Sequence, residues 1–299
     1  MDLTRLLLGL PNILVFVVFC PLHLRILYVF LASKEYRRNR CYQIMIQMKI
    51  FTILLLPLYL FMGLSILLES PIFGIPLRLM EYSDFSLVPL GALDVLLALN
   101  RVMVIFDVTY PNVLDYVLQV VVWLLGCFVL IIPTLRLTGF QFSADFLSLF
   151  PDMDKQWESE YLTYAVYYEL INTSFTVICY IAIIIRLFLK KAKTGRMGIS
   201  NHEAKILIFS LVRFLGDVVT VICVQASAML ESSGENMTAV YILSQAIGYL
   251  YMVNFVCLPP ILFLVLNRKL RRTVLKLKET NLVSVVSTQG PRLSTAVKK

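Results

Sequence analysis

The sequence contains little charge and almost no histidine. Only 15% of its 299 residues are Asp, Glu, Lys or Arg, whereas 59% are hydrophobic, and a water-soluble domain of this size carries far more charge. The two histidines, His23 and His202, lie far apart, and neither an HExxH nor a GxGD motif occurs. Because a catalytic nucleophile with its base, or a set of metal ligands, is missing, we expect no enzyme and no metal or other cofactor.

Cysteine is missing from the polar loops. All six cysteines fall within, or at the edge of, long apolar stretches: Cys20, Cys41, Cys127, Cys179, Cys223 and Cys257. A buried cysteine packs as a small apolar side chain and needs no further function. The sequence therefore predicts no extracellular disulfide.

Long apolar stretches, in contrast, run through the whole chain. Seven of them have about 20 residues or more, which is the length an α-helix needs to cross a hydrocarbon core of about 30 Å. They cover Leu6–Leu31, Cys41–Leu67, Ile75–Phe106, Tyr116–Leu137, Leu162–Leu189, Ala204–Leu230 and Ala239–Leu266. The third is too long for a bilayer, so it either begins nearer Tyr82 or protrudes and tilts. The predicted fold class is an all-α membrane protein, a seven-transmembrane helix bundle.

Seven spans with short loops leave no room for a second folded domain. We expect one membrane domain over residues 1–278 and a disordered tail over 279–299, which is rich in Ser and Thr and has no clear apolar period. The basic stretch 268–278 (RKLRRTVLKLK) predicts a short amphipathic eighth helix that lies on anionic lipid.

Basic residues cluster in alternate gaps between the spans. They are Lys34, Arg37, Arg38 and Arg40, then Lys190, Lys191, Lys193 and Arg196, then Arg268, Lys269, Arg271, Arg272, Lys276 and Lys278. The positive-inside rule then places the N-terminus outside and the C-terminus in the cytoplasm, although loop 107–115 contains no Lys or Arg. These basic residues at the membrane edges would contact anionic lipid, so the net charge of +8 predicts no nucleic-acid partner. Asn236, in an outer loop, begins a glycosylation sequon.

Ionisable residues inside the spans are the next informative feature, because each costs several kcal/mol unless it is paired, hydrated or close to the interface. The candidates are Arg25, Lys49, Asp84, Asp94, Arg101, Glu169, Arg213 and Asp217. Arg213 and Asp217 are four residues apart on one helix, so they share a face and can pair. For Asp94 we expect a buried partner on another helix, either Lys49 or Arg213. Paired charges inside spans also mark proton or substrate paths in transporters, although the two halves of this chain show no internal repeat.

Short motifs near the ends of the spans resemble those of rhodopsin-like G-protein-coupled receptors. The run Asn100-Arg101-Val102 resembles their Asp-Arg-Tyr motif, and Pro260 with Phe263 resembles the Pro and Tyr of Asn-Pro-x-x-Tyr. Together, CYQIM (41–45), ALNR (98–101) and PPILF followed by NRKLRR (259–272) closely resemble the nematode serpentine chemoreceptors of the group with classes T, V and X.

The resemblance implies a chemosensory receptor in the plasma membrane, with a sensory cilium as its finer location. It would bind a small-molecule or small-peptide ligand from outside and activate a heterotrimeric G protein at its cytoplasmic face. The residues implied in coupling and activation are Asn100, Arg101, Tyr180, Glu203, Pro260 and Phe263. Glu203 could pair with Arg101 in the resting state, or be an exposed acid at a helix start.

Departures from the receptor pattern keep other functions open. The sixth span lacks Trp-x-Pro, and Asn100 replaces the acid before Arg101. A secondary transporter of a small solute that uses Lys49, Asp94, Arg213 and Asp217 is one alternative, and a non-signalling receptor-like membrane protein is another. A retinal protein is not expected, because residues 239–266 contain no Lys for a Schiff base.

Polar and aromatic side chains in the outer halves of the spans are candidates for ligand binding. They are Tyr82, Asp84, Phe85, Tyr168, Glu169, Gln225, Gln245 and Tyr249. Asp84 and Glu169 would favour a cationic or hydrogen-bond-donating ligand if both face inward, whereas structural contacts within the membrane are the other explanation for them. Loop 138–161 is long and acidic, and we expect it to form a lid over this pocket with Trp157 as an anchor.

Overall fold

The computed structural model describes residues 3–70, 72–108, 111–143, 148–194, 201–233 and 237–275. The predicted tail 279–299 and the sequon residue Asn236 lie outside this part of the chain, as does the side chain of Glu203.

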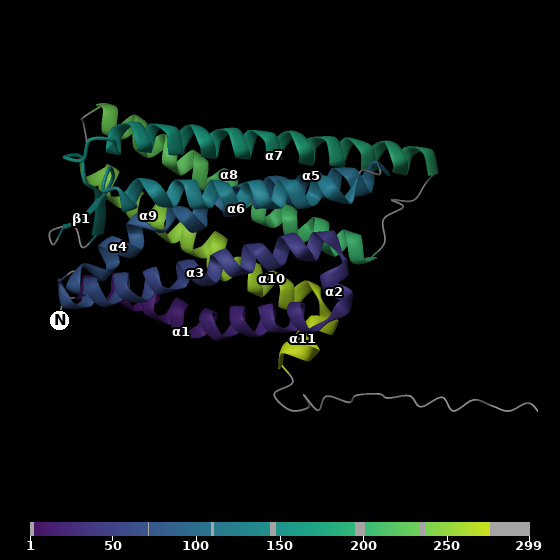
Figure 1. Cartoon of the computed structure of the whole chain (residues 1–299), viewed down its shortest axis with the longest axis horizontal. Coiled ribbons are helices and arrows are strands. Elements are labelled where there is room, and N and C mark those ends of the chain that lie inside the picture. Colours follow the sequence, from purple (N-terminus) through teal and green to yellow (C-terminus); the bar gives the residue numbers. More distant parts are fainter. Residues whose placement is uncertain are drawn as a thin grey trace, which may run out of the picture.

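Seven of the helical segments are long and apolar enough to cross a membrane, which confirms the seven expected spans. They are α1 (Leu3–Ala32), α3 (Arg40–Leu68), α4 with α5 (Ile75–Glu81, Asp84–Ile105), α6 (Asn112–Thr134), α7 (Glu158–Thr194), α8 (Asn201–Ser233), and α9 (Met237–Tyr251) continued by a π-helix, η2 (Met252–Cys257), and α10 (Leu258–Leu266). The long helices lie side by side in one elongated bundle (Figure 1).

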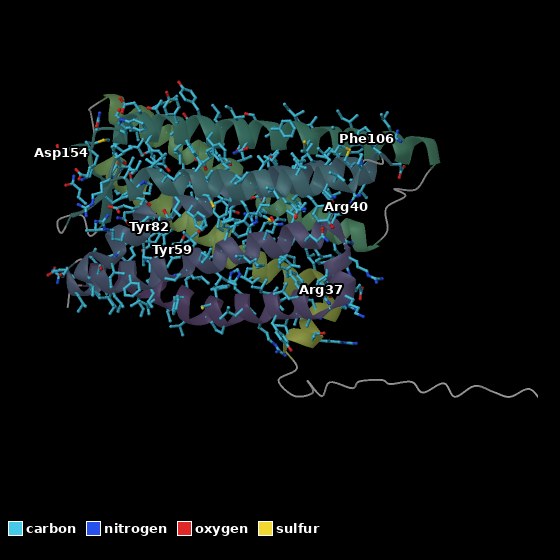
Figure 2. All side chains as sticks on the ribbon, in the orientation of Figure 1. Arg37, Arg40, Tyr59, Tyr82, Phe106 and Asp154 are labelled. Atoms are coloured by element: carbon cyan, nitrogen blue, oxygen red, sulfur yellow. The ribbon has the colours of Figure 1, made fainter. Side chains whose placement is uncertain are left out.

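The two ends of the bundle carry different short elements. The N-terminus, η1 (Ile72–Gly74), α4 and a β-hairpin of β1 (Phe140–Ser143) and β2 (Ser148–Pro151) lie at one end, which we call the hairpin end. The helices α2 (Lys34–Arg38) and α11 (Arg268–Leu275) lie at the other, which we call the α11 end (Figure 1). Arg37 and Arg40 lie at the α11 end and Asp154 at the hairpin end (Figure 2).

The long third span is interrupted at the place that the sequence had suggested. After α4 ends at Glu81, Tyr82 and Ser83 form a turn in which the Ser83 hydroxyl donates a hydrogen bond to the Met80 carbonyl at 2.7 Å. The next helix, α5, begins at Asp84. The break fits a span that starts near Tyr82, whereas the apolar segment as a whole runs from Ile75 to Ile105, so the choice between the two expectations stays a prediction.

The β-hairpin is a small exception to the all-helical expectation. Phe140 pairs with Pro151 and Ser143 with Ser148 in antiparallel register. Two hydrogen bonds fix the hairpin to the start of α7, from the Gly139 backbone nitrogen to Oε2 of Glu158 at 2.8 Å and from the Trp157 nitrogen to the Leu137 carbonyl at 3.2 Å. Four-residue strands contain too few alternations for a period-2 pattern to be recognised in the sequence.

The predicted amphipathic eighth helix is present as α11. Leu270 and Val274 are buried against the bundle, whereas Arg268, Arg271 and Arg272 are exposed. The Asn267 side chain caps the helix by accepting a hydrogen bond from the Leu270 nitrogen at 3.0 Å. A basic face opposite an apolar one suits a helix that lies in a membrane interface.

A proline in the last span accounts for two buried polar side chains in the first two long helices. Pro260 has no N–H, so it cannot donate to the carbonyl of Val256 four residues earlier. That carbonyl instead accepts a hydrogen bond from Nε2 of His23 at 2.9 Å. The other ring nitrogen, Nδ1, is then unprotonated and accepts from Nζ of Lys49 at 3.2 Å. These hydrogen bonds join α1 and α3 to the π-helical segment η2, one turn before Pro260.

We expect His23→Ala to lower the free energy of unfolding by about 2–3 kcal/mol, because it removes a hydrogen-bond partner from two buried polar groups. These are the Val256 carbonyl and the Lys49 ammonium. Thermal unfolding in detergent micelles would measure the loss, with the exposed Leu24→Ala as the control. A melting temperature equal to that of the control would contradict this assignment.

Candidate functional site

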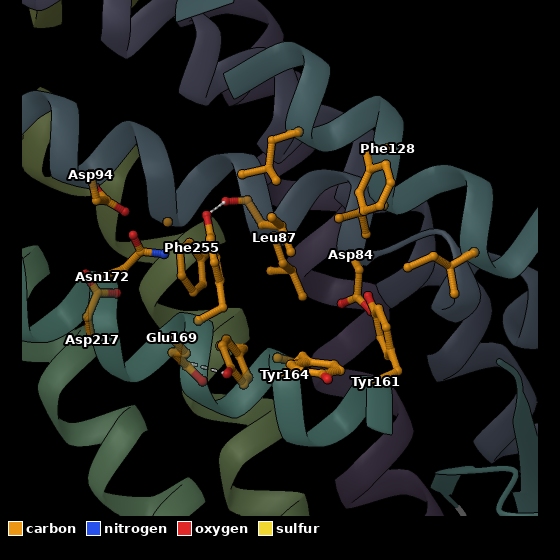
Figure 3. Close-up of a pocket in the computed structure, with 18 residues that line it drawn as sticks. Asp84, Leu87, Asp94, Phe128, Tyr161, Tyr164, Glu169, Asn172, Asp217 and Phe255 are labelled. Atoms are coloured by element: carbon orange, nitrogen blue, oxygen red, sulfur yellow. Dashed lines mark hydrogen bonds between the residues drawn. The ribbon is translucent and has the colours of Figure 1, made fainter. Parts of the chain in front are cut away.

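A cavity of about 370 Å³ lies among the five helices α5 to α9 and the π-helical segment η2. It extends along α5 from Asp84 to Asp94, which is about 15 Å at the α-helical rise. Its walls are formed by Asp84, Leu87, Val88, Gly91 and Asp94 of α5, Leu125, Phe128, Val129 and Ile132 of α6, Tyr161, Tyr164, Ala165, Tyr168, Glu169 and Asn172 of α7, Asp217 of α8, and Tyr251 and Phe255. Figure 3 shows these side chains around the space.

Two tyrosine–carboxylate hydrogen bonds cross the cavity walls. The Tyr161 hydroxyl donates to Oδ2 of Asp84 at 2.6 Å, which joins α7 to the start of α5. The Tyr251 hydroxyl donates to Oε1 of Glu169 at 2.8 Å, which joins α9 to α7 (Figure 3). A third tyrosine, Tyr168, donates to the backbone carbonyl of Val88 at 2.7 Å. The tyrosines therefore hold the two acids and α5 in place around the space.

The inner end of the cavity holds the buried charges. Nη2 of Arg213 donates to Oδ2 of Asp94 at 2.8 Å, and Asn254 donates to Asp217 at 2.5 Å. The sequence allowed a pair between Arg213 and Asp217 on one helix, but the guanidinium is bonded to Asp94 on α5 instead. Of the two partners expected for Asp94, Arg213 is the correct one, because Lys49 is bonded to His23.

Three of the eight candidate ligand-binding residues line the cavity: Asp84, Tyr168 and Glu169. The other five, Tyr82, Phe85, Gln225, Gln245 and Tyr249, are absent from its lining. Phe85 turns toward α3, where its ring lies 5.8 Å from that of Phe51, and the Tyr249 hydroxyl donates to the Leu8 carbonyl at 2.9 Å. These two side chains belong to the packing between helices.

Sequence reasoning missed the contribution of α6 and part of that of α7. The α7 lining residues follow a helical spacing from Tyr161 to Asn172, and those of α6 repeat from Leu125 to Ile132. The α7 set mixes Tyr, Glu and Asn with apolar residues at i, i+3 and i+4, which is a signal that helical periodicity could have found. The α6 set is wholly apolar, like any lipid-facing stripe, so no signal separated it from the rest of its span.

The predicted coupling residues lie toward the α11 end. Arg101 is 5% exposed, and its Nη2 donates to Oδ1 of Asn100 at 2.9 Å, so the amide provides the acceptor that an acid would provide. The ring of Tyr180 lies 5.1 Å from that of Phe214, which joins α7 to α8. Because the side chain of Glu203 lies outside the described residues, its pairing with Arg101 stays a prediction.

A second, smaller cavity of about 70 Å³ lies near the α11 end, between α3, α8 and α10. Tyr42, Lys205, Phe209, Phe263 and Asn267 are among the side chains that line it. The Phe209 and Phe263 rings stack at 4.5 Å, while the predicted motif proline Pro260 is buried one turn before Phe263. The stacked rings therefore form part of the contact between α8 and α10 at this end.

Comparison with known proteins supports the architecture. No protein-family model and no curated protein sequence matches the chain. Among solved structures, squid rhodopsin is similar, with a TM-score of 0.74 and 13% sequence identity over 92% of this chain and 80% of that one. At this identity the likeness shows the fold alone. The chain is a multi-pass membrane protein with the seven-helix fold of rhodopsin.

Proposed function

We propose that the protein is a chemosensory receptor that binds a small external ligand in the 370 Å³ cavity and activates a heterotrimeric G protein at the α11 end. The proposal takes the hairpin end as external and the α11 end as cytoplasmic. Exposed basic side chains at the α11 end support this orientation: Lys34, Arg37, Arg38, Arg268, Arg271 and Arg272. The plasma membrane, and a sensory cilium within it, is the proposed location.

The observation that carries the proposal is that one helix, α5, bears both the cavity and Arg101. Asp94 lines the cavity, and Arg101 follows it by seven residues, which is about 10 Å or two turns further along the same helix. A ligand that contacts Asp94 acts directly on the Asp94–Arg213 pair, and so on how α8 sits against α5. The ligand cavity and the coupling end are therefore mechanically connected through two helices.

The second half of the mechanism concerns α8 at the α11 end. Phe209 and Arg213 are four residues apart on this helix, so they lie on one face, and Phe209 stacks on Phe263 of α10. A shift of α8 that follows a change at Arg213 would separate these rings and enlarge the 70 Å³ cavity beside them. A ligand drives such a shift only as far as it binds the shifted arrangement more tightly than the resting one.

The test is a nucleotide-exchange assay on a panel of G proteins, with wild type and Arg101→Ala at matched surface levels. We expect Arg101→Ala to reduce basal or ligand-driven exchange at least about tenfold, which corresponds to about 1.4 kcal/mol of coupling. The control is Arg78→Ala, which removes an ion pair with Glu81 at the hairpin end, at 2.6 Å, and should leave exchange unchanged.

The outcome also separates this proposal from its alternatives. Exchange that is equal in wild type and Arg101→Ala would contradict the proposed role of Arg101. Wild-type protein that drives no exchange but supports ion or solute flux would favour a transporter, in which the buried charges Lys49, Asp94, Arg213 and Asp217 would lie on the permeation path. If the protein supports no nucleotide exchange and no flux, the result would favour a non-signalling receptor-like protein.

A further inference from the structure

The helices that form the walls of the 370 Å³ cavity pack against one another to different extents. α5 packs closely against both α6 and α7 over much of its length. α6 and α7, which form the opposite walls, make almost no close backbone approach to each other. The cavity between them is therefore bounded at this side by side chains alone, among the residues that the structure describes.

Two of those side chains line the cavity and are also exposed on the outside of the bundle. Phe128 of α6 is 63% exposed and Tyr164 of α7 is 72% exposed, and both lie in segments that cross the membrane. We take the exposed parts of these two side chains to face lipid, because the outer surface of a helix bundle in a bilayer contacts the hydrocarbon core. Phe128 and Tyr164 thus border an opening between the cavity and the hydrocarbon region, which we call the lateral opening.

The hairpin end offers a poorer route into the same space. There, the Tyr161–Asp84 hydrogen bond joins α7 to α5 at the cavity margin. About one turn earlier, Glu158 fixes the hairpin segment through the Gly139 nitrogen. A ligand arriving from water would have to separate these contacts, whereas one dissolved in the bilayer would meet only Phe128 and Tyr164.

The lining also specifies the chemistry of the ligand. Four carboxylates, Asp84, Asp94, Glu169 and Asp217, line the cavity, and most of the remaining lining is aliphatic or aromatic. Of these four carboxylates, only that of Asp94 has a Lys or Arg ion-pair partner among the residues that the structure describes. Asp84 and Glu169 accept from tyrosine hydroxyls, and Asp217 accepts from Asn254. A cation that enters this low-dielectric space would supply the counter-charge that these acids lack.

We infer that the cavity takes a lipophilic amine, which enters from the bilayer through the lateral opening and places its ammonium against Glu169. Its alkyl chain would lie along the α6 wall of Leu125, Val129 and Ile132. The inference rests on the ligand cavity of the proposed function and names both its ligand class and its route. It requires no G protein, so it can be tested apart from signalling.

Ligand class is tested by equilibrium binding of tritiated dodecylamine to the full chain in lipid nanodiscs, with empty nanodiscs as background. We expect dodecylamine to bind saturably and dodecanol and dodecanoate to compete at least about tenfold more weakly. Glu169→Gln should weaken binding by a similar factor, whereas Glu160→Gln, an exposed acid on the same helix, should not. Absence of saturable binding, or equal competition by dodecanoate, would overturn the amine assignment.

The route is tested by blocking the lateral opening chemically. In a Cys127→Ser background, Phe128→Cys and Tyr164→Cys are alkylated with a lipophilic maleimide, and we expect the association rate of dodecylamine to fall about tenfold. The matched controls are Leu124→Cys and Tyr167→Cys, which are 62% and 57% exposed on the same helices but do not line the cavity. Equal rates in all four alkylated variants would overturn the lateral route.

The two binding experiments and the exchange assay test different claims, so each claim can be contradicted without the others. Dodecylamine binding without G-protein exchange would leave the inference standing and remove the proposed function. If exchange depends on Arg101 but the protein binds no dodecylamine, the proposed function would stand and the inference would fall. Binding that is unaffected at the lateral opening but lost in Glu169→Gln would retain the ligand class and overturn only the route.

Discussion

Arg213→Met is expected to lower the free energy of unfolding by about 3–5 kcal/mol, the usual loss when one partner of a buried ion pair is removed. Arg213 is 2% exposed, and its guanidinium bonds Asp94 and lies 5.0 Å from the centre of the Phe255 ring. Methionine fills much of the same volume without a charge. The loss would therefore come from the Asp94 carboxylate, which would remain buried without its cation.

The double variant Asp94→Asn/Arg213→Met separates this explanation from simple loss of packing. If the cost of the single change is an uncompensated charge, the double variant should recover most of the stability, because both charges are then gone. Thermal unfolding in nanodiscs compares wild type, the two single variants and the double variant, with Arg78→Met, at an exposed arginine of the hairpin end, as a fifth protein for control. A double variant as unstable as the sum of its two single variants would contradict the ion-pair explanation.

The same pair shows how far the sequence determines a membrane core. Hydropathy placed the seven spans, and charge inside an apolar span identified Asp94 and Arg213 as members of a buried network. The choice of partner could not be made, because Asp94 and Arg213 are 119 positions apart and their approach depends on how α5 and α8 pack. Local spacing favoured Asp217, four residues from Arg213, and the packing between helices overrode it.

A similar limit applies to the ligand cavity. The positions of Asp84 and Glu169 in the outer halves of their spans were enough to predict that they share a site, and both line the cavity. Phe85 was predicted to join the same site because it is an aromatic side chain in the outer half of its span. Neighbouring residues on a helix point about 100° apart, so Phe85 faces α3 instead. Periodicity gives the relative directions on one helix, whereas the rotation of that helix in the bundle comes from its contacts.

Pro260 illustrates a third kind of gap. Its motif could be recognised from the sequence, but its structural consequence lies elsewhere in the chain. The Val256 carbonyl, to which Pro260 cannot donate, accepts from His23, 233 positions away, which in turn accepts from Lys49. Neither His23 nor Lys49 carries a sequence signal for this pairing beyond being polar inside an apolar span.

The second large effect is expected at the contact between α1 and α3, where two glycines allow the backbones to approach. A Cβ placed on Gly63 would lie 2.7 Å from the carbonyl oxygen of Gly9 and 2.8 Å from Cγ1 of Ile13. Both distances are shorter than van der Waals contact, and a backbone carbonyl cannot rotate away as a side chain can. Small residues that let backbones approach in this way are typical of packed membrane helices.

Gly63→Leu should therefore lower the free energy of unfolding by about 3 kcal/mol or more, at the upper end of the cost of overpacking a core. The matched control is Gly248→Leu on α9, because a Cβ there meets no atom within 4 Å and the change should cost within about 0.5 kcal/mol. Thermal unfolding of the two variants in the same nanodiscs gives the comparison. Equal melting temperatures would show that α1 can move away from α3 at little cost. In that case the ion pair between Glu69 and Arg5, which lies at the end of this contact, would separate as well.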